Sequence, residues 1–99
     1  MSKINPVSDS PKFHYVYILR SKKNKQWYVG CTSDLRKRFK QHNNGELKSW
    51  TKGRGPFELI YYEAYLNPKD AWVREKQLKS GPGRRYMRER LKRFLSLTG

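Results

Sequence analysis

Acidic residues are scarce in this chain. Its 99 residues include 8 Asp and Glu against 23 Lys and Arg, which gives a formal net charge of +15 at pH 7. Such an excess of positive charge points to a polyanionic partner, with nucleic acid as the first candidate. An anionic membrane is the weaker candidate, because the basic residues are interleaved with Tyr and Trp along several segments. Charge alone does not separate an enzyme from a binding protein.

Cysteine is almost absent as well. Cys31 is the only one, which excludes an intramolecular disulfide and a zinc site built on several thiolates. The sequence also lacks a run of about 18 apolar residues and the apolar N-terminal run of a signal peptide. We therefore expect a reduced, cytoplasmic protein with no membrane partner, in which Cys31 is a small packed residue.

Hydrophobic residues make up 35% of the chain, which is enough for one domain with a modest core and not for two. Residues 1–12 include two prolines and little that could be buried, so we expect a flexible leader there. We expect residues 13–99 to form a single domain with a basic C-terminal helix.

Three segments have the aromatic and β-branched content of strands. Two of them, residues 13–19 and residues 26–32, flank a polar segment that is unsuited to a core, so we expect residues 20–26 to connect them as a β-hairpin. The third strand is expected over residues 57–64, just after Pro56.

Helix signals follow these strands. Ser33 is placed to cap a helix over residues 34–43, and Asn67 to cap one over residues 68–80, which a Gly-Pro-Gly sequence should end. A last helix is expected over residues 84–97. The order strand, strand, helix, strand, helix, helix predicts a small α+β fold with a three-stranded central sheet flanked by helices.

A pair of tyrosine triplets is the most informative pattern in the chain. Tyr15-Val16-Tyr17 precedes Tyr28-Val29-Gly30, and the expected hairpin places the two triplets side by side. A phenol both donates and accepts a hydrogen bond. Two of them near a phosphate can therefore orient a water and relay its proton.

Arg38 and His42 are four residues apart on the first expected helix, so they project from one face. A guanidinium binds phosphate oxygens through two parallel hydrogen bonds, and an imidazole can donate to a neighbouring oxygen or take a proton. These two residues alone would favour a solvated or backbone-binding basic face over catalysis.

Glu75 stands in the middle of the second helix, between Ala71 and Leu78, which mark its buried side. A carboxylate there is costly to bury unless it meets a cation. An ion pair with Lys79 or a nearby arginine and a bound metal are equally good interpretations. If the partner is a metal, the scarcity of other acids favours one hydrated Mg²⁺ over a two-metal site.

The remaining aromatic and basic residues divide between core and surface. We expect Trp27, Tyr61, Tyr62 and Tyr65 to pack in the core or on a sheet face rather than to stack on bases, with Trp50 as the exception. The candidates for phosphate contacts are Lys37, Lys40, Lys48, Lys52, Arg54, Arg84 and Arg85.

Together, the paired triplets, Arg38 and His42 on the following helix, and Glu75 in a later helix resemble the GIY-YIG nuclease domain. The resemblance runs from about Tyr15 through Leu78. It extends to the small standalone bacterial members, which are related to the nuclease module of the excision-repair enzyme and to phage homing endonucleases.

The resemblance implies a role for each residue of the triplets. Tyr17 would orient or deprotonate the attacking water, Tyr28 would support it, and Gly30 would let the strand end pass close to its neighbours. The first triplet, with Val16 at its centre, lacks the glycine for which the family is named. A phenol with a pKa near ~10 is a poor base at neutral pH unless neighbouring cations depress that pKa.

The resemblance also implies that Arg38 holds the scissile phosphate, that His42 assists in the same pocket, and that Glu75 binds a single Mg²⁺ or Mn²⁺. Some members carry an asparagine after the metal helix, and residues 80–85 of this chain contain none.

The function implied is a metal-dependent endonuclease that hydrolyses DNA to a 5′-phosphate and a 3′-hydroxyl, structure-selective or non-specific, in DNA repair or recombination. The alternative is a catalytically weak or inactive nucleic-acid-binding module of the same fold. DNA is the expected partner, and RNA is the second candidate.

Overall fold

A computed structural model describes residues 11–46 and 52–98. The elements in chain order are β1 (His14–Ser21), β2 (Trp27–Thr32), α1 (Leu35–Asn43), β3 (Phe57–Tyr65), α2 (Pro68–Lys79), α3 (Gly81–Arg90) and α4 (Lys92–Thr98). The predicted α+β fold with a three-stranded sheet is confirmed. Most of the expected leader, together with Lys48 and Trp50, lies outside the described residues.

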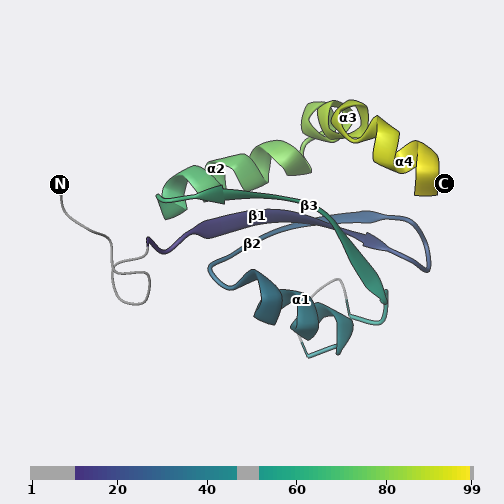
Figure 1. The fold of residues 1–99 in the computed structure, drawn as a ribbon, viewed down its shortest axis with the longest axis horizontal. Coiled ribbons are helices and arrows are strands. Elements are labelled where there is room, and N and C mark those ends of the chain that lie inside the picture. Colours follow the sequence, from purple (N-terminus) through teal and green to yellow (C-terminus); the bar gives the residue numbers. More distant parts are fainter. Residues whose placement is uncertain (1–10, 47–51, 99) are drawn as a thin grey trace.

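The sheet is antiparallel and has the strand order β2-β1-β3. Figure 1 shows α1 on one face of the sheet, and α2, α3 and α4 on the other. Because β1 has a strand on each side and helices over both faces, residues 16–21 of β1 are all buried. No helix within the two described ranges is both long and apolar enough to cross a bilayer.

The alternation of side chains along β1 divides the core in two. Val16 and Ile18 belong to a cluster on the α2 face, and Tyr17 and Leu19 belong to a cluster on the α1 face. The first cluster is completed by Trp27, Val29, Ala71, Leu78 and Met87, and the second by Tyr28 and Phe57. Tyr17 and Tyr28, one from each triplet, therefore lie on the same face.

An irregularity in β3 changes which side chains face α1. The pairing between β1 and β3 skips Ile60, so Ile60 and Tyr61 both pack against the cluster on the α2 face. Tyr62 then lies opposite Tyr17, on the α1 face of the sheet. An extra residue in one strand redirects every side chain beyond it.

The first helix starts one residue later than predicted. Asp34 has extended backbone dihedrals and its carboxylate accepts a hydrogen bond from the Lys37 amide at 3.1 Å, so Asp34 and not Ser33 is the N-cap. Ser and Asp cap helices about equally well. Adjacent capping residues therefore leave the exact start undetermined in the sequence.

The second helix begins as predicted and ends differently. Asn67 caps it through the Lys69 amide, and Pro68 takes its first position. Ser80 then ends α2 and caps α3, because its hydroxyl accepts from the Gly83 amide at 3.1 Å. The Gly-Pro-Gly sequence expected to stop a helix forms instead the first turn of the next one. Proline is tolerated there because first-turn amides have no helical partner.

The predicted single helix over residues 84–97 is two helices that meet at Leu91. The break brings α4 to one end of the sheet, where Phe94 lies 5.3 Å from the guanidinium of Arg20 and Thr98 accepts a hydrogen bond from it at 2.9 Å. Arg20 also forms an ion pair with Glu58 and is 4% exposed. The prediction that Arg20 belongs to a polar hairpin connection was therefore wrong, since paired charges can be buried.

Candidate active site

Tyr17 is the centre of the predicted site. Its side chain is 3% exposed, and a hydrogen bond of 2.9 Å joins its Oη to Nε2 of His42, whose ring packs edge-on at 5.9 Å. The Tyr17 ring lies directly against Gly30 of β2, where a Cβ atom would overlap the phenol oxygen and its ring carbon. Gly30 is therefore required for the position of the phenol. The structural role predicted for Gly30 is thus to leave room for the Tyr17 ring.

Burial raises the pKa of Tyr17 to about 12. Arg38 opposes this effect through its positive charge and a hydrogen bond, and the charge of Glu75 reinforces it. The effect of burial on the pKa is larger than the opposing effect of Arg38. The pKa of Tyr17 is therefore not depressed, as it would have to be for the phenol to act as a strong base. Tyr17 is a neutral phenol at neutral pH.

His42 is also neutral. Burial lowers the pKa of this imidazole below 6.5, and the positive charge of Arg38 lowers it further. A neutral imidazole has one donor and one acceptor nitrogen, so the direction of the hydrogen bond to Tyr17 follows the tautomer. The pair thus consists of two uncharged groups between which a proton can pass.

Arg38 and Glu75 belong to helices on opposite faces of the sheet. Arg38 belongs to α1 and Glu75 to α2, and the charges of both act on Tyr17 and on Cys31 of β2. Cys31 is half-buried, and burial followed by the charge of Glu75 raises the pKa of its thiol, so it stays protonated. The structure therefore brings Tyr17, Gly30, Arg38 and His42 together, and Glu75 acts on Tyr17 and Cys31 through its charge.

The ion pair weighed for Glu75 is present. Its Oε2 lies 3.2 Å from Nζ of Lys79, one turn further along α2, and the side chain is 23% exposed. Among the described residues, no group of three or more His, Cys, Asp or Glu side chains could together hold a metal ion. Any metal at this site would rest on one carboxylate and on water, which suits a hydrated Mg²⁺.

Tyr28 lies on the same face as Tyr17 but in a different setting. It is 7% exposed, its ring packs edge-on against Phe57 at 5.4 Å, and its hydroxyl donates to Oε1 of Gln26 at 3.1 Å. The hydrogen bond to Gln26 holds the hydroxyl near the start of β2. The role of Tyr28 in supporting the water stays a prediction.

Two further residues fix the helices that carry the site. Asn43, at the end of α1, accepts a hydrogen bond from the Phe57 amide at 2.7 Å and so ties α1 to β3. Sequence reasoning missed Asn43, because no local signal shows an amide side chain that bonds to a backbone far along the chain.

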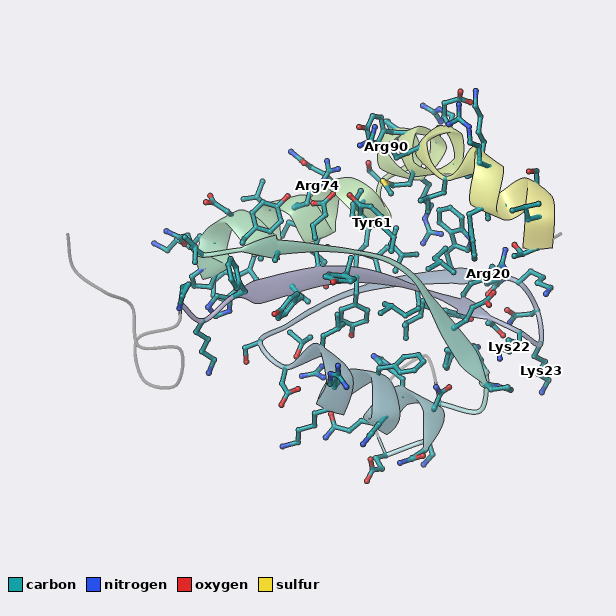
Figure 2. The ribbon with its side chains drawn as sticks, viewed as in Figure 1. Arg20, Lys22, Lys23, Tyr61, Arg74 and Arg90 are labelled. Carbon is teal, nitrogen blue, oxygen red and sulfur yellow. The ribbon has the colours of Figure 1, made fainter. Side chains whose placement is uncertain are left out.

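Glu63 of β3 anchors α2. Its carboxylate accepts hydrogen bonds from Tyr61, Tyr65 and Arg74, and the Arg74 Nε lies 2.9 Å from its Oε1. Figure 2 shows Tyr61 and Arg74 close together between β3 and α2. Burial alone would raise the pKa of Glu63, but these hydrogen bonds hold that pKa below its usual range. The anchor adjoins the candidate metal ligand, since Arg74 precedes Glu75.

The candidate phosphate contacts form two groups around the site. Lys37 and Lys40 are exposed on α1, and exposed Lys52 and Arg54 lie just before β3. On the other side, Arg84 lines a pocket of about 610 Å³ along β2, together with Lys79 and Arg88. Exposed Arg85 is its neighbour on α3.

The aromatic residues assigned to the core or a sheet face mostly fit that prediction. Trp27 is 5% exposed, and Tyr61 and Tyr65 are half-buried beside Glu63. Tyr62 lies on a sheet face as expected but is 54% exposed. Its exposure was not foreseen. Val16 and Val29 of the triplets are buried core residues, and Tyr15 is half-buried.

A protein-family model and several known proteins match this chain. The family model described as the GIY-YIG catalytic domain matches residues 13–90. The chain is similar to the UPF0213 protein CPE1444 of Clostridium perfringens, with 46% identity over 67% of this chain and 70% of that protein. It is also similar to the UPF0213 protein OB0043 of Oceanobacillus iheyensis, with 39% identity over 70% of this chain and 79% of that protein.

Among solved structures, the chain is similar to the solution NMR structure of the UPF0213 protein BH0048 from Bacillus halodurans. The two share 36% identity over 88% of this chain and 86% of that chain, with a TM-score of 0.44. The match to the family model covers both tyrosine triplets and the residues gathered around Tyr17, and the chain belongs to the GIY-YIG nuclease family.

Proposed function

We propose that this protein is a metal-dependent endonuclease that hydrolyses DNA phosphodiester bonds in the cytoplasm, in DNA repair or recombination. One observation carries the proposal: a hydrogen bond of 2.9 Å joins Tyr17 to His42, one turn from Arg38 on α1, and the candidate metal ligand Glu75 lies on α2. A proton relay, a phosphate-binding guanidinium and a carboxylate for a metal are the parts that hydrolysis of a phosphodiester needs.

Arg38 binds the scissile phosphate in this proposal. Its guanidinium is half-buried and close enough to Tyr17 for a hydrogen bond to influence the phenol. Charge-assisted hydrogen bonds to phosphate oxygens are about twice as strong as neutral ones. They strengthen as negative charge develops on those oxygens, so Arg38 stabilises the transition state more than the ground state.

The Tyr17 and His42 pair takes the proton from the attacking water. Because the pKa of Tyr17 is about 12, the phenol acts as a relay and not as a standing phenolate. The oxygen of the water bonds to phosphorus while its proton passes to Tyr17 Oη, and the proton of Tyr17 passes to Nε2 of His42. This step uses the tautomer protonated at Nδ1. The bond from phosphorus to O3′ breaks, and O3′ takes a proton from solvent.

The products are a 5′-phosphate and a 3′-hydroxyl. His42 then returns its extra proton to solvent, which its lowered pKa favours. The imidazole therefore begins the next cycle neutral, as the relay requires. The role of Arg38 in lowering that pKa means that the same cation binds phosphate and keeps His42 ready to accept a proton.

Glu75 would hold one hydrated Mg²⁺ or Mn²⁺. Its half-buried carboxylate is balanced by Lys79, an exposed side chain that can move aside when an ion binds. When bound, such an ion polarises a phosphoryl oxygen and stabilises charge on the leaving oxygen.

A second candidate function has its own support. The ion pair between Glu75 and Lys79 satisfies the carboxylate without a metal, and the raised pKa of Tyr17 disfavours the phenolate. Both observations suit a nucleic-acid-binding module that keeps the nuclease fold and cuts weakly or not at all.

Cleavage of labelled DNA with Mg²⁺, Mn²⁺ or a chelator tests the proposal. We expect Glu75→Gln, Tyr17→Phe and Arg38→Ala to lower metal-dependent cleavage by at least about 100-fold. Glu89→Gln is the matched control, because Glu89 also pairs with a lysine on a helix, at 2.8 Å, but lies exposed on α3. Salt-sensitive binding of DNA without cleavage by the wild-type protein would support the binding module, and cleavage of RNA alone would change the substrate.

A further inference from the structure

Three aromatic rings form a row on the α1 face of the sheet. The ring centroids of Phe13 and Tyr15 are 6.5 Å apart, and those of Tyr15 and Tyr62 are 5.9 Å apart. Phe13 is 36% exposed and Tyr62 is 54% exposed. Tyrosine and phenylalanine side chains usually stabilise a protein by being buried. A row of partly exposed rings therefore offers a surface for a ligand that has π faces of its own.

The row begins beside the candidate active centre. Tyr15 precedes Tyr17 by two residues on β1, so the two side chains share a face, at positions about 6.6–6.8 Å apart along the strand. Tyr62 lies on that face because the pairing skips Ile60, and it stands opposite Tyr17 across the strands. Strand irregularities of this kind redirect side chains next to active sites.

A pocket of about 480 Å³ separates Tyr15 and Tyr62 from α1. Its apolar wall is made by Leu35, Phe39 and Leu59, and its polar wall by Ser33, Asp34 and Arg36. Such a pocket fits a flat group with apolar faces and hydrogen-bonding edges. A nucleobase has this chemistry.

We propose that Tyr15 and Tyr62 stack on an unpaired nucleobase next to the scissile phosphate, so that the preferred substrate is DNA with unpaired bases. The proposal rests on the nuclease function proposed above and names its substrate class. A base inside a duplex is already stacked and paired, and reaching the rings would cost its unstacking. A base in a single strand, a flap or a branch pays no such cost.

The charge around the pocket complements this ligand. Arg36, Lys37 and Lys40 are exposed on α1, next to the pocket. They can hold the phosphates that flank a stacked base. Proteins that bind single strands combine a basic path for the backbone with aromatic platforms for the bases.

The test is equilibrium binding in chelator, where no cleavage occurs. The probes are a short DNA single strand with one 2-aminopurine, whose fluorescence is quenched by stacking, and the same strand paired to its complement. The variants are Tyr62→Ala, Tyr62→Phe and Tyr62→Leu. Trp72→Ala is the matched control, because Trp72 is 56% exposed on α2, which covers the other face of the sheet.

We expect Tyr62→Ala and Tyr62→Leu to weaken binding of the single strand by about tenfold or more. Tyr62→Phe keeps the ring and the affinity, and Trp72→Ala changes neither probe. Binding of the duplex changes less than about twofold, since it depends on phosphate contacts. Circular dichroism verifies that each variant is folded. If Tyr62→Ala does not fold, the comparison of Tyr62→Leu with Tyr62→Phe tests the proposal instead.

Equal affinity of Tyr62→Leu and Tyr62→Phe for the single strand would overturn the proposal, because an apolar contact would then suffice. Equal losses on both probes would overturn it too. Either result would leave metal-dependent cleavage by the wild type intact. Conversely, loss of stacking in Tyr62→Ala together with no cleavage by the wild type would refute the nuclease function and keep the base site.

Discussion

The substitution Gly30→Ala should damage the candidate active site without removing any of its functional groups. A Cβ atom at this position would overlap Oη and Cζ of Tyr17 and lie 3.0 Å from its Cε1. Carbon atoms in contact prefer about 3.5–4.0 Å. Because the ring carbon and the oxygen are the nearest atoms, the hydroxyl end of Tyr17 must move by roughly 1 Å or more.

Two costs follow from that movement. Overpacking in a well-packed core destabilises proteins by about 1–3 kcal/mol. The displaced phenol also loses its 2.9 Å hydrogen bond to His42, and a misplacement of about 1 Å at a reacting group can lower the rate by on the order of 100-fold. We therefore expect Gly30→Ala to be modestly less stable and severely less active.

A double-mutant cycle measures the clash directly. Urea unfolding is recorded for wild type, Gly30→Ala, Tyr17→Ala and the double variant, and cleavage rates are recorded in parallel. Without the Tyr17 ring, the alanine loses its three closest contacts, so its cost should fall sharply, and alanine also loses less entropy than glycine in a strand. Gly81→Ala is the control, because its nearest contact would be the flexible Arg85 side chain at 3.6 Å.

The reasoning would be refuted if Gly30→Ala cost the same stability with and without Tyr17. It would also be refuted if Gly30→Ala kept the wild-type cleavage rate, since the phenol would then not need its present position.

Three further predictions concern stability. Glu63→Gln should lower the free energy of unfolding by about 1–3 kcal/mol, because Arg74 loses its charged partner. It should also make stability fall less steeply in acid. The lowered pKa of Glu63 stabilises the wild-type fold above pH 4.5, and this contribution disappears as the pH falls through the pKa that Glu63 has in the folded protein. Gly83→Ala should destabilise by more than about 1 kcal/mol, because its Cβ would overlap the Gln77 carbonyl, and backbone cannot rotate away. His42→Gln should remove a loss of stability below pH 6.5, where the unfolded imidazole takes up a proton that the folded one resists.

Urea unfolding at a series of pH values measures the effects of Glu63→Gln and His42→Gln, and thermal unfolding measures that of Gly83→Ala. An acid loss that persists unchanged in Glu63→Gln would contradict the first prediction. A neutral Gly83→Ala would contradict the second, and a wild-type profile in His42→Gln would contradict the third.

The start of a helix could be predicted from the sequence where only one residue was suited to cap it. Asn67 and Pro68 together allow one start for α2, and the structure has it there. Ser33 and Asp34 are adjacent and equally able to cap, so the start of α1 was displaced by one residue. Local chemistry decides such positions only when one residue stands alone.

Features that depend on contacts between distant parts of the chain could not be predicted in the same way. Spacing placed Arg38 and His42 on one face of their helix, and the structure joins His42 to Tyr17 by a hydrogen bond, with the charges of Arg38 and Glu75 acting on Tyr17. The irregularity at Ile60 has no local signature, since it arises from pairing with β1, and it is the reason that Tyr62 faces α1. The burial of Arg20 likewise depends on Glu58 and Thr98, which lie far along the chain.

The hydrogen bonds between Glu63 and Arg74 have a rotational consequence. Successive side chains on a helix differ in direction by about 100°, so fixing Arg74 toward β3 fixes the direction of Glu75 beside it. The rotation of α2 about its own axis is thus fixed by Glu63, a residue that takes no part in the proposed chemistry. A change at Glu63 would turn the carboxylate of Glu75 relative to Tyr17 while leaving every group of the site in the sequence.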